Sequence, residues 1–145
     1  MRKQCICLLS LFLAATVFAQ PRLTIDKLDR EDIAAIAKEV SFSTLLEGTI
    51  ENPDLAVYVL VREPNGNDWR SYPATVDGTR VDPAGGYRWR AICHFGGYDG
   101  DGVGLSYKVR VIAIDPEGIT PGNLLNSLSA ASFQTGDITI KRVRK

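Results

Sequence analysis

The alternation of apolar and polar residues over 87–95, broken only by Ile92, constrains the fold more than any other feature of the sequence. The odd-numbered positions carry Tyr87, Trp89, Ala91, Cys93 and Phe95. The even-numbered positions carry Arg88, Arg90, Ile92 and His94. Successive side chains of a strand point to opposite faces of a sheet, so the pattern predicts a strand with one buried face and one face in water.

Several other short segments have the composition of strands, and turn signals separate them. Residues 105–113 repeat the alternation, with Leu105, Tyr107, Val109, Val111 and Ala113 on one face. The remaining strand candidates are 40–50, 55–61, 69–72, 75–76 with 79–81, and a closing strand within 133–140. Gly, Pro, Asn and Asp lie between these segments, which is typical of tight connections. The pattern predicts an all-β fold, an antiparallel β-sandwich of about seven strands.

A short helix is expected before the first long strand, within an entry segment over 20–40. Asp29 can cap its N-terminus, with Asp32 three residues later. The residues that follow at the spacing of one helical face are Ile33, Ile36, Ala37 and Val40. We therefore predict a helix over about 29–38, followed by a β-sandwich domain over 41–145.

The N-terminus has the three zones of a secretory signal in their usual order. Arg2 and Lys3 give a positive start, and an apolar run covers 6–18. Val17 and Ala19 place short side chains at the −3 and −1 positions of a cleavage site. The apolar run is shorter than the roughly 20 residues that a bilayer span needs. We expect residues 1–19 to be removed, no transmembrane segment to remain, and the protein to be periplasmic or secreted; an uncleaved membrane anchor is the alternative.

Removal of this signal changes the charge and the cysteine content. The whole chain has 17 basic residues, 17 acidic residues and three cysteines. Two basic residues and two cysteines lie within the signal, so about 126 residues remain with a net charge of about −2 and only Cys93. This balance gives no electrostatic basis for nucleic-acid binding, and one cysteine makes no intramolecular disulfide. A hydrophobic core must therefore hold the fold.

Core and turn residues in the middle of the chain carry a family resemblance. The segments concerned are 46–50, 56–62, 69–72, 87–91, 95–96 and 107–114. Together they resemble the immunoglobulin-like β-sandwich of bacterial exported and envelope-associated proteins. The resemblance implies a non-catalytic binding or spacing module whose partner is a protein or glycan of the cell envelope. The entry helix and the single cysteine differ from antibody-type domains, which have a disulfide between the sheets.

Four basic residues fall on the predicted polar faces of two strands. These residues are Arg88, Arg90, Lys108 and Arg110. If the two strands are neighbours, the side chains form a basic strip that can meet an anionic glycan, a lipid headgroup or an acidic protein. The alternative is a solvated face whose charges have cross-strand partners. The basic residues at 141–145 are interpreted as a mobile tail.

Aromatic residues beside loops indicate a second kind of binding. Trp69 and Tyr98 lie next to predicted turns, and an aromatic ring can stack on the apolar face of a sugar. With the glycine-rich loop 96–104, they suggest a carbohydrate-binding accessory domain as the alternative function. Packing in the core or at its rim is the competing interpretation.

The same loop carries two carboxylates, Asp99 and Asp101, at a spacing of two. Oxygen ligands on a glycine-rich loop suit Ca²⁺, but a full calcium-binding loop needs more acidic residues and a late Glu. Val103 and Leu105 occupy positions where further ligands are wanted. A calcium site is one hypothesis and a loop without metal is the other. No other cofactor is expected.

The sequence contains no recognised catalytic motif. His94 is the only histidine and falls on the predicted polar face, whereas Cys93 falls on the predicted buried face. The two side chains therefore point apart, and we expect an exposed histidine and a buried, unreactive cysteine. The sequence predicts a binding or spacing module rather than an enzyme.

Overall fold

The computed structural model describes residues 23–33, 38–81, 85–118 and 133–144, so the predicted signal over 1–19 lies outside the described residues. The regular elements in the described part are strands, apart from one 3₁₀ turn, η1 (Pro116–Gly118), and no helix there is long and apolar enough to cross a membrane. The strands are β1 (Lys27–Leu28), β2 (Glu31–Asp32), β3 (Glu39–Val40), β4 (Ser43–Ile50), β5 (Ala56–Arg62), β6 (Trp69–Pro73), β7 (Thr75–Arg80), β8 (Tyr87–His94), β9 (Ser106–Ile114), β10 (Phe133–Gln134) and β11 (Ile138–Arg142). Seven of the described strands have five or more residues, and the all-β prediction is confirmed.

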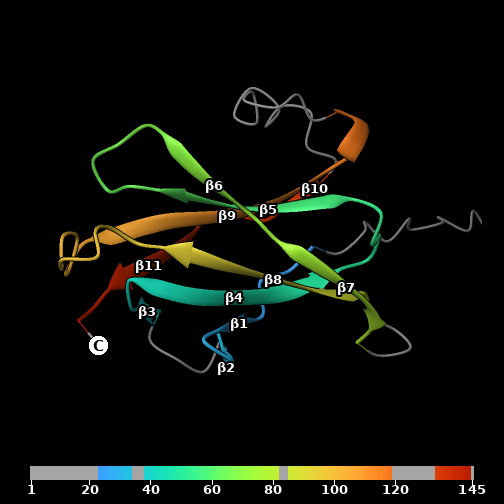
Figure 1. The fold of residues 1–145 in the computed structure, drawn as a ribbon, viewed down its shortest axis with the longest axis horizontal. Coiled ribbons are helices and arrows are strands. Elements are labelled where there is room, and N and C mark those ends of the chain that lie inside the picture. The colour runs from blue at the N-terminus through green and yellow to red at the C-terminus, as the bar shows by residue number, and fades with distance from the viewer. Residues whose placement is uncertain (1–22, 34–37, 82–84, 119–132, 145) are drawn as a thin grey trace, which may run out of the picture.

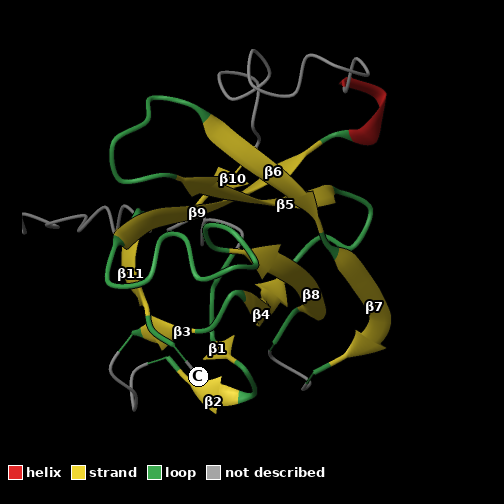
Figure 2. Ribbon diagram, turned by 60° about the vertical axis from the view of Figure 1, so that its left-hand side comes forward, coloured by secondary structure: helices red, strands yellow, loops and turns green. Residues whose placement is uncertain are grey.

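The strands form two sheets that face each other across one core (Figure 1). The five-stranded sheet has the order β2-β1-β4-β8-β7. The six-stranded sheet has the order β3-β11-β9-β5-β6, with β10 also paired to β9. The pairs between described strands are antiparallel except for β3 and β11, which run parallel. Figure 2 shows β5, β6 and β9 in one layer and β4, β7 and β8 in the other, an arrangement consistent with a β-sandwich.

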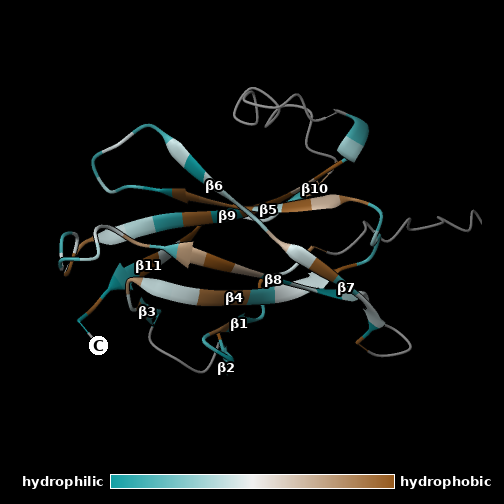
Figure 3. Cartoon of the chain, in the orientation of Figure 1, coloured by the Kyte–Doolittle hydropathy of each residue, from teal (hydrophilic) through white to brown (hydrophobic). Residues whose placement is uncertain are grey.

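The core lies between the sheets because the long strands alternate as the sequence predicts. Trp89, Ala91 and Cys93 on β8 are buried, and Phe95 continues the same face beyond the strand. The facing strands β5 and β9 contribute Val57, Val59, Val61, Tyr107, Val109 and Val111. The indole N–H of Trp89 donates to the carbonyl oxygen of Thr24 at 3.0 Å, which satisfies the one polar atom of this buried ring. Figure 3 shows hydrophobic stretches within β5, β8 and β9.

The chain changes sheets between β6 and β7. Pro73 ends β6 opposite Tyr58, and Thr75 begins β7 opposite Arg90 of the other sheet. Between them, the amide of Ala74 donates to a carbonyl of β5 at 2.9 Å. Proline has no backbone donor, so it suits the outermost strand of a sheet. β6 and β7 therefore form a corner that joins one edge of each sheet.

The predicted helix over 29–38 is wrong where the chain is described. β1 and β2 pair as an antiparallel hairpin, and residues 34–37 lie outside the described residues. Asp29 and Arg30 make its turn with φ values of 48° and 72°, the left-handed pair that a type I′ hairpin turn requires. The Asp29 carboxylate, which we expected to cap a helix, accepts the amide of Leu45 in β4 at 3.0 Å. Pairing with a distant strand thus overrides the local helical spacing.

β11 carries the alternation to the end of the described chain. It pairs with β9 on one side and with β3 on the other. Ile140 and Arg142 are buried, while Thr139 and Lys141 are exposed. The last inward-facing position of this strand is therefore an arginine, at the end of the sandwich where β11 leaves the sheet.

Candidate functional site

An open cavity of about 700 Å³ lies at one end of the sandwich. Three segments form its walls: the turn between β3 and β4, the loop between β8 and β9, and the end of β11. The lining residues are Ser41, Phe42, Ser43, Tyr98, Asp99, Gly100, Val103, Arg142, Val143 and Arg144. We call this space the end cavity.

Backbone hydrogen bonds fix the three walls to the sheets. The amide of Phe95 donates to the carbonyl of Phe42 at 2.9 Å, and the amide of Val143 donates to the carbonyl of Val40 at 2.9 Å. The amide of Gly104 donates to the carbonyl of Arg142 at 2.8 Å. Because each wall is bonded to a strand or to another wall, the end cavity is part of the framework of the fold.

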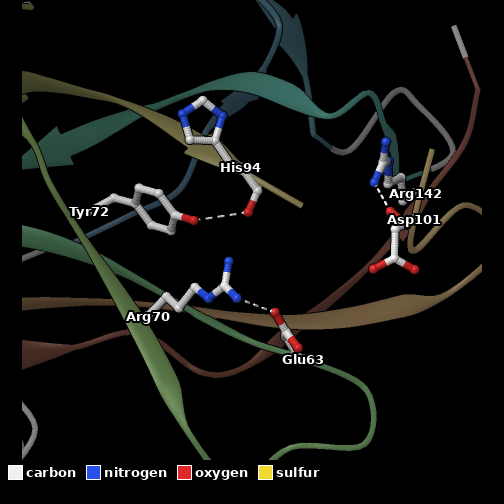
Figure 4. Close-up of polar contacts among 6 residues, drawn as sticks. All are labelled: Glu63, Arg70, Tyr72, His94, Asp101 and Arg142. Carbon is white, nitrogen blue, oxygen red and sulfur yellow. Dashed lines mark hydrogen bonds and ion pairs between the residues drawn. The ribbon is translucent and has the colours of Figure 1, made fainter. Parts of the chain in front are cut away.

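Four rings form a row that ends at the cavity: Tyr72, His94, Phe42 and Tyr98. His94 stacks on Phe42, with ring centroids 4.9 Å apart and 18° between the planes. Tyr98 meets Phe42 edge-on at 5.7 Å, and Tyr72 meets His94 edge-on at 5.9 Å. The Tyr72 hydroxyl also donates to the His94 carbonyl at 3.0 Å (Figure 4). Tyr98 is 90 % exposed, so the row ends in a ring that a ligand can reach.

Arg142 places a buried positive charge against this row, because the residue is only 3 % exposed. Its Nη1 donates to the carbonyl oxygen of Asp101, whereas the Asp101 carboxylate points away from it (Figure 4). Its guanidinium carbon lies 5.4 Å from the centroid of the Phe42 ring. The ion pairs of the described residues do not include Arg142, and its Nε has no hydrogen-bond partner. A buried cation with an unused donor is costly for the fold alone.

The loop over 96–104 folds closely around Arg142. Its left-handed residues are Gly96, Gly100, Gly102 and Gly104, with φ values of 76°, 99°, 86° and 84°. A Cβ atom at Gly96 would collide with Nη1 of Arg142, and one at Gly102 would collide with the hydroxyl of Tyr107. These two glycines therefore serve both the backbone turn and the close approach of buried side chains.

A second cavity of about 480 Å³ borders the same loop. Glu63 and Arg70 line it and form an ion pair at 2.9 Å (Figure 4). Tyr107 also lines it, and burial raises the pKa of its hydroxyl. The lining arginine has its carboxylate partner within the chain, unlike Arg142 in the end cavity.

Trp69 and Tyr98, the two candidates for sugar binding in the alternative function, lie in different places. Trp69 belongs to the outer face of the six-stranded sheet, where it packs against Leu60, Ile112 and Ile114. The guanidinium carbons of Arg62 and Arg110 lie 5.1 Å and 5.2 Å from its ring centroid. Asp137 accepts a hydrogen bond from Arg110 at 2.6 Å. We call the group formed by Arg62, Trp69, Arg110 and Asp137 the outer cluster. Of the two aromatic candidates, Tyr98 lines the end cavity and Trp69 does not.

The basic strip that was expected if the two strands were neighbours does not form. Arg88 and Arg90 lie on β8, which pairs with β4 and β7 in the five-stranded sheet. Lys108 and Arg110 lie on β9, which pairs with β5, β10 and β11 in the six-stranded sheet. Arg90 has an ion-pair partner in Asp77 at 3.5 Å, and Arg110 has one in Asp137. The alternative of solvated faces with local partners describes these two arginines.

Asp99 and Asp101 stay close together in the loop, as their spacing predicts. Oδ1 of Asp99 accepts the backbone amide of Asp101 at 3.2 Å. Within the described ranges, no group of three or more His, Cys, Asp or Glu side chains is arranged to hold a metal ion. The calcium hypothesis stays a prediction, and this geometry adds no third acidic ligand to it.

Cys93 and His94 point to opposite faces, as expected. Cys93 is fully buried and makes no disulfide with a described residue, and desolvation raises the pKa of its thiol to about 12. Such a thiol carries almost no thiolate at neutral pH, so it is a poor nucleophile. His94 is exposed and packs between Phe42 and Tyr72.

Sequence reasoning missed Phe42 and Arg142. The interpretation of 141–145 as a mobile tail is wrong for Lys141 and Arg142, which belong to β11. The pattern of Ile138, Ile140 and Arg142 at every second position carried the signal, because a strand continued by two residues turns Arg142 toward the core. Nothing in the local sequence places Phe42 against His94.

Comparisons with known proteins identify no relative: no protein-family model, no curated protein and no solved structure matches the chain.

Proposed function

We propose that the protein is an exported, non-catalytic binding module that takes its ligand at the end cavity. The observation that carries this proposal is the joint presence of an exposed ring, Tyr98, and a buried, incompletely bonded cation, Arg142, in one cavity of about 700 Å³. Ligand sites combine such a concave space with a few polar groups of defined direction. The walls are tied to two sheets, so the site is formed before the ligand arrives.

Export and fold type are part of the same proposal. The zones of residues 1–19 support export to the periplasm or the exterior, where a protein or glycan of the cell envelope is the partner. Two facing sheets with a chain that changes sheets at Pro73 support an immunoglobulin-like type of sandwich. N-terminal sequencing of protein recovered from outside the cytoplasm tests the first point: a start at Gln20 is expected, and a start at Met1 would refute it.

Carbohydrate binding is the second candidate, and Tyr98 favours it. A tyrosine that is 90 % exposed beside a cavity is available to stack on a sugar ring. Trp69 supports it less, because two guanidinium groups and the underlying apolar side chains surround its ring.

Labelled protein applied to envelope fractions and to a glycan array tests the binding site. We expect Tyr98→Ala to lose the signal of the wild type. Ile92→Ala is the matched control, because Ile92 is also an exposed apolar side chain, 60 % exposed, on the outer face of β8. Equal binding by wild type and Tyr98→Ala would move the site away from the end cavity, and binding of neither material would refute the binding function.

A further inference from the structure

We propose that the end cavity binds an acidic sugar, a uronate residue whose carboxylate pairs with the guanidinium of Arg142. This inference rests on the proposed binding function and names its ligand class. It begins from Arg142, because a fully charged side chain occupies a core position of β11 while two isoleucines hold equivalent positions of the strand.

The bonding of Arg142 leaves part of its capacity unused. Its Nη1 is occupied by the Asp101 carbonyl, and Phe42 lies against the guanidinium. Its Nε has no partner either but has almost no accessible surface, so the Nη atoms are the donors left for a carboxylate in the cavity. A carbonyl oxygen and a ring are partial partners for a full charge, whereas the planar guanidinium fork matches a carboxylate with two parallel hydrogen bonds.

The rest of the lining fits the body of a sugar. Tyr98 offers an exposed ring for the apolar face of a pyranose. Ser41, Ser43 and Asp99 are among the lining residues, and sugar hydroxyls can hydrogen-bond to hydroxyl and carboxylate groups. A volume of about 700 Å³ lies within the usual range of small-ligand sites.

The balance of charge favours a singly charged sugar unit over a dense polyanion. Arg142 and Arg144 are opposed by Asp99 in the same lining. The carboxylate of one uronate can approach the arginines while the hydroxyls of the same sugar ring face Asp99. A chain of closely spaced phosphates would bring negative groups against that carboxylate.

Calorimetric titration of the purified protein with trisaccharides of galacturonate and of mannuronate tests the proposal. The matched ligand is the methyl ester of each trisaccharide, which keeps the shape and removes the charge. We expect at least one acid to bind and its ester to bind about tenfold or more weakly, because a charge-assisted hydrogen bond is lost. The affinity of the acid should also fall between low and moderate salt.

Arg142→Met and Arg142→Lys separate the role of the positive charge from that of the planar guanidinium geometry. We expect Arg142→Met to lose about tenfold or more in affinity for the acid and to bind acid and ester alike. Arg142→Lys should recover only part of the affinity, since an ammonium group does not make the two parallel bonds. Arg88→Gln is the control, because it removes one exposed charge from the outer face of β8 and should bind as the wild type does.

The outcomes distinguish this inference from the function on which it rests. Thermal melting with the near-ultraviolet circular dichroism spectrum shows whether each variant is folded, and a folded Arg142→Met that binds the acid like the wild type refutes the inference. Binding of neutral sugars or of acidic peptides alone, abolished by Tyr98→Ala, also refutes it but leaves the end cavity as a binding site. Failure of every sugar, peptide and envelope fraction refutes both.

Discussion

The molecule contains two arginine–aromatic contacts that look alike and differ in what surrounds them. In the outer cluster, the guanidinium of Arg110 lies 5.2 Å from the ring centroid of Trp69. At the end cavity, that of Arg142 lies 5.4 Å from Phe42. The Arg110 side chain is 29 % exposed and bonded to Asp137, whereas Arg142 is 3 % exposed and has no described carboxylate partner.

This difference separates a structural contact from a binding site. At the sheet surface, water and a carboxylate of the same chain neutralise the arginine, and the contact needs nothing more. Beneath the 96–104 loop, Arg142 is a buried charge for which the described part of the chain provides no carboxylate counter-ion, and such a charge is costly to the fold. Groups left this way are found where function opposes stability. Arg110 and Arg142 therefore differ in two respects: how closely the chain packs around the guanidinium group, and whether a carboxylate is bonded to it.

The largest expected effect on the free energy of unfolding is at Gly102, in the loop that packs around Arg142. Gly102→Ala should lower the free energy of unfolding by about 3 kcal/mol, because its left-handed backbone disfavours a side chain and the new Cβ atom meets the Tyr107 hydroxyl. Gly104→Ala is the control: its φ is similar, 84°, but a Cβ atom there meets nothing within 4 Å. We expect a loss of about 1 kcal/mol for it in urea unfolding. Equal losses would mean that the loop is not packed as described.

The next effect distinguishes the two predicted sugar-binding aromatics. Trp69→Ala should lower the free energy of unfolding by about 2 kcal/mol, since the ring covers Leu60, Ile112 and Ile114. Tyr98→Ala should change it by less than about 0.5 kcal/mol, because that ring is 90 % exposed. Urea unfolding of both variants checks the order, and a larger loss for Tyr98→Ala would contradict the structural role of Trp69.

The strands were predictable because each long strand carries its own evidence. One face of β8 is buried, so Trp89, Ala91 and Cys93 alternate with exposed residues, which are polar except for Ile92. The alternation also holds in β9 from Tyr107 to Val111, whereas Ile112 and Ile114 beyond it are buried on the other face of the sheet. Where the local pattern competes with a distant contact, sequence reasoning fails. The spacing after Asp29 favours a helix, but its carboxylate bonds to Leu45 and its backbone makes a hairpin turn.

The candidate site was predictable only in its loop. The position of Tyr98 beside glycines indicated an exposed ring, and it lines the end cavity. Arg142 and Phe42 reach the same cavity from segments far apart in the chain, through pairing of β11 with β3 and through the turn into β4. The order of strands in the sheets determines which distant segments come into contact, and the periodicity of the local sequence does not specify that order. The hypothesis of a basic strip failed for the same reason, because the sequence does not give the strand order and Arg88 and Lys108 lie in different sheets.

Substitution of the two arginines tests the comparison directly. Arg110→Met should lower the free energy of unfolding by about 1 kcal/mol, because it removes contacts to Trp69 and Asp137 near the surface. Arg142→Met should leave it within about 1 kcal/mol of the wild type or raise it, since an apolar side chain replaces an uncompensated buried charge. Urea unfolding without ligand measures both. A loss above 3 kcal/mol for Arg142→Met would show that the fold itself requires this charge.

The smallest effect concerns Asp137, the carboxylate partner of Arg110, which has no counterpart beside Arg142 among the described residues. The hydrogen bond from Arg110 lowers the pKa of Asp137 below its ordinary value of 3.8. A carboxyl whose pKa is lower in the folded state stabilises the fold above its unfolded pKa and loses that contribution as the pH falls through the folded value. Asp137→Asn should therefore cost less than about 1 kcal/mol at neutral pH, because both side chains are nearly a third exposed, and the cost should vanish in acid. In an Arg110→Met background, Asp137→Asn should cost clearly less, because the largest cause of the lowered pKa is absent and only the weaker attraction of Lys108 and Arg62 remains. An undiminished cost in that background would assign the stabilisation to Lys108 or Arg62 and remove the distinction between the two arginines.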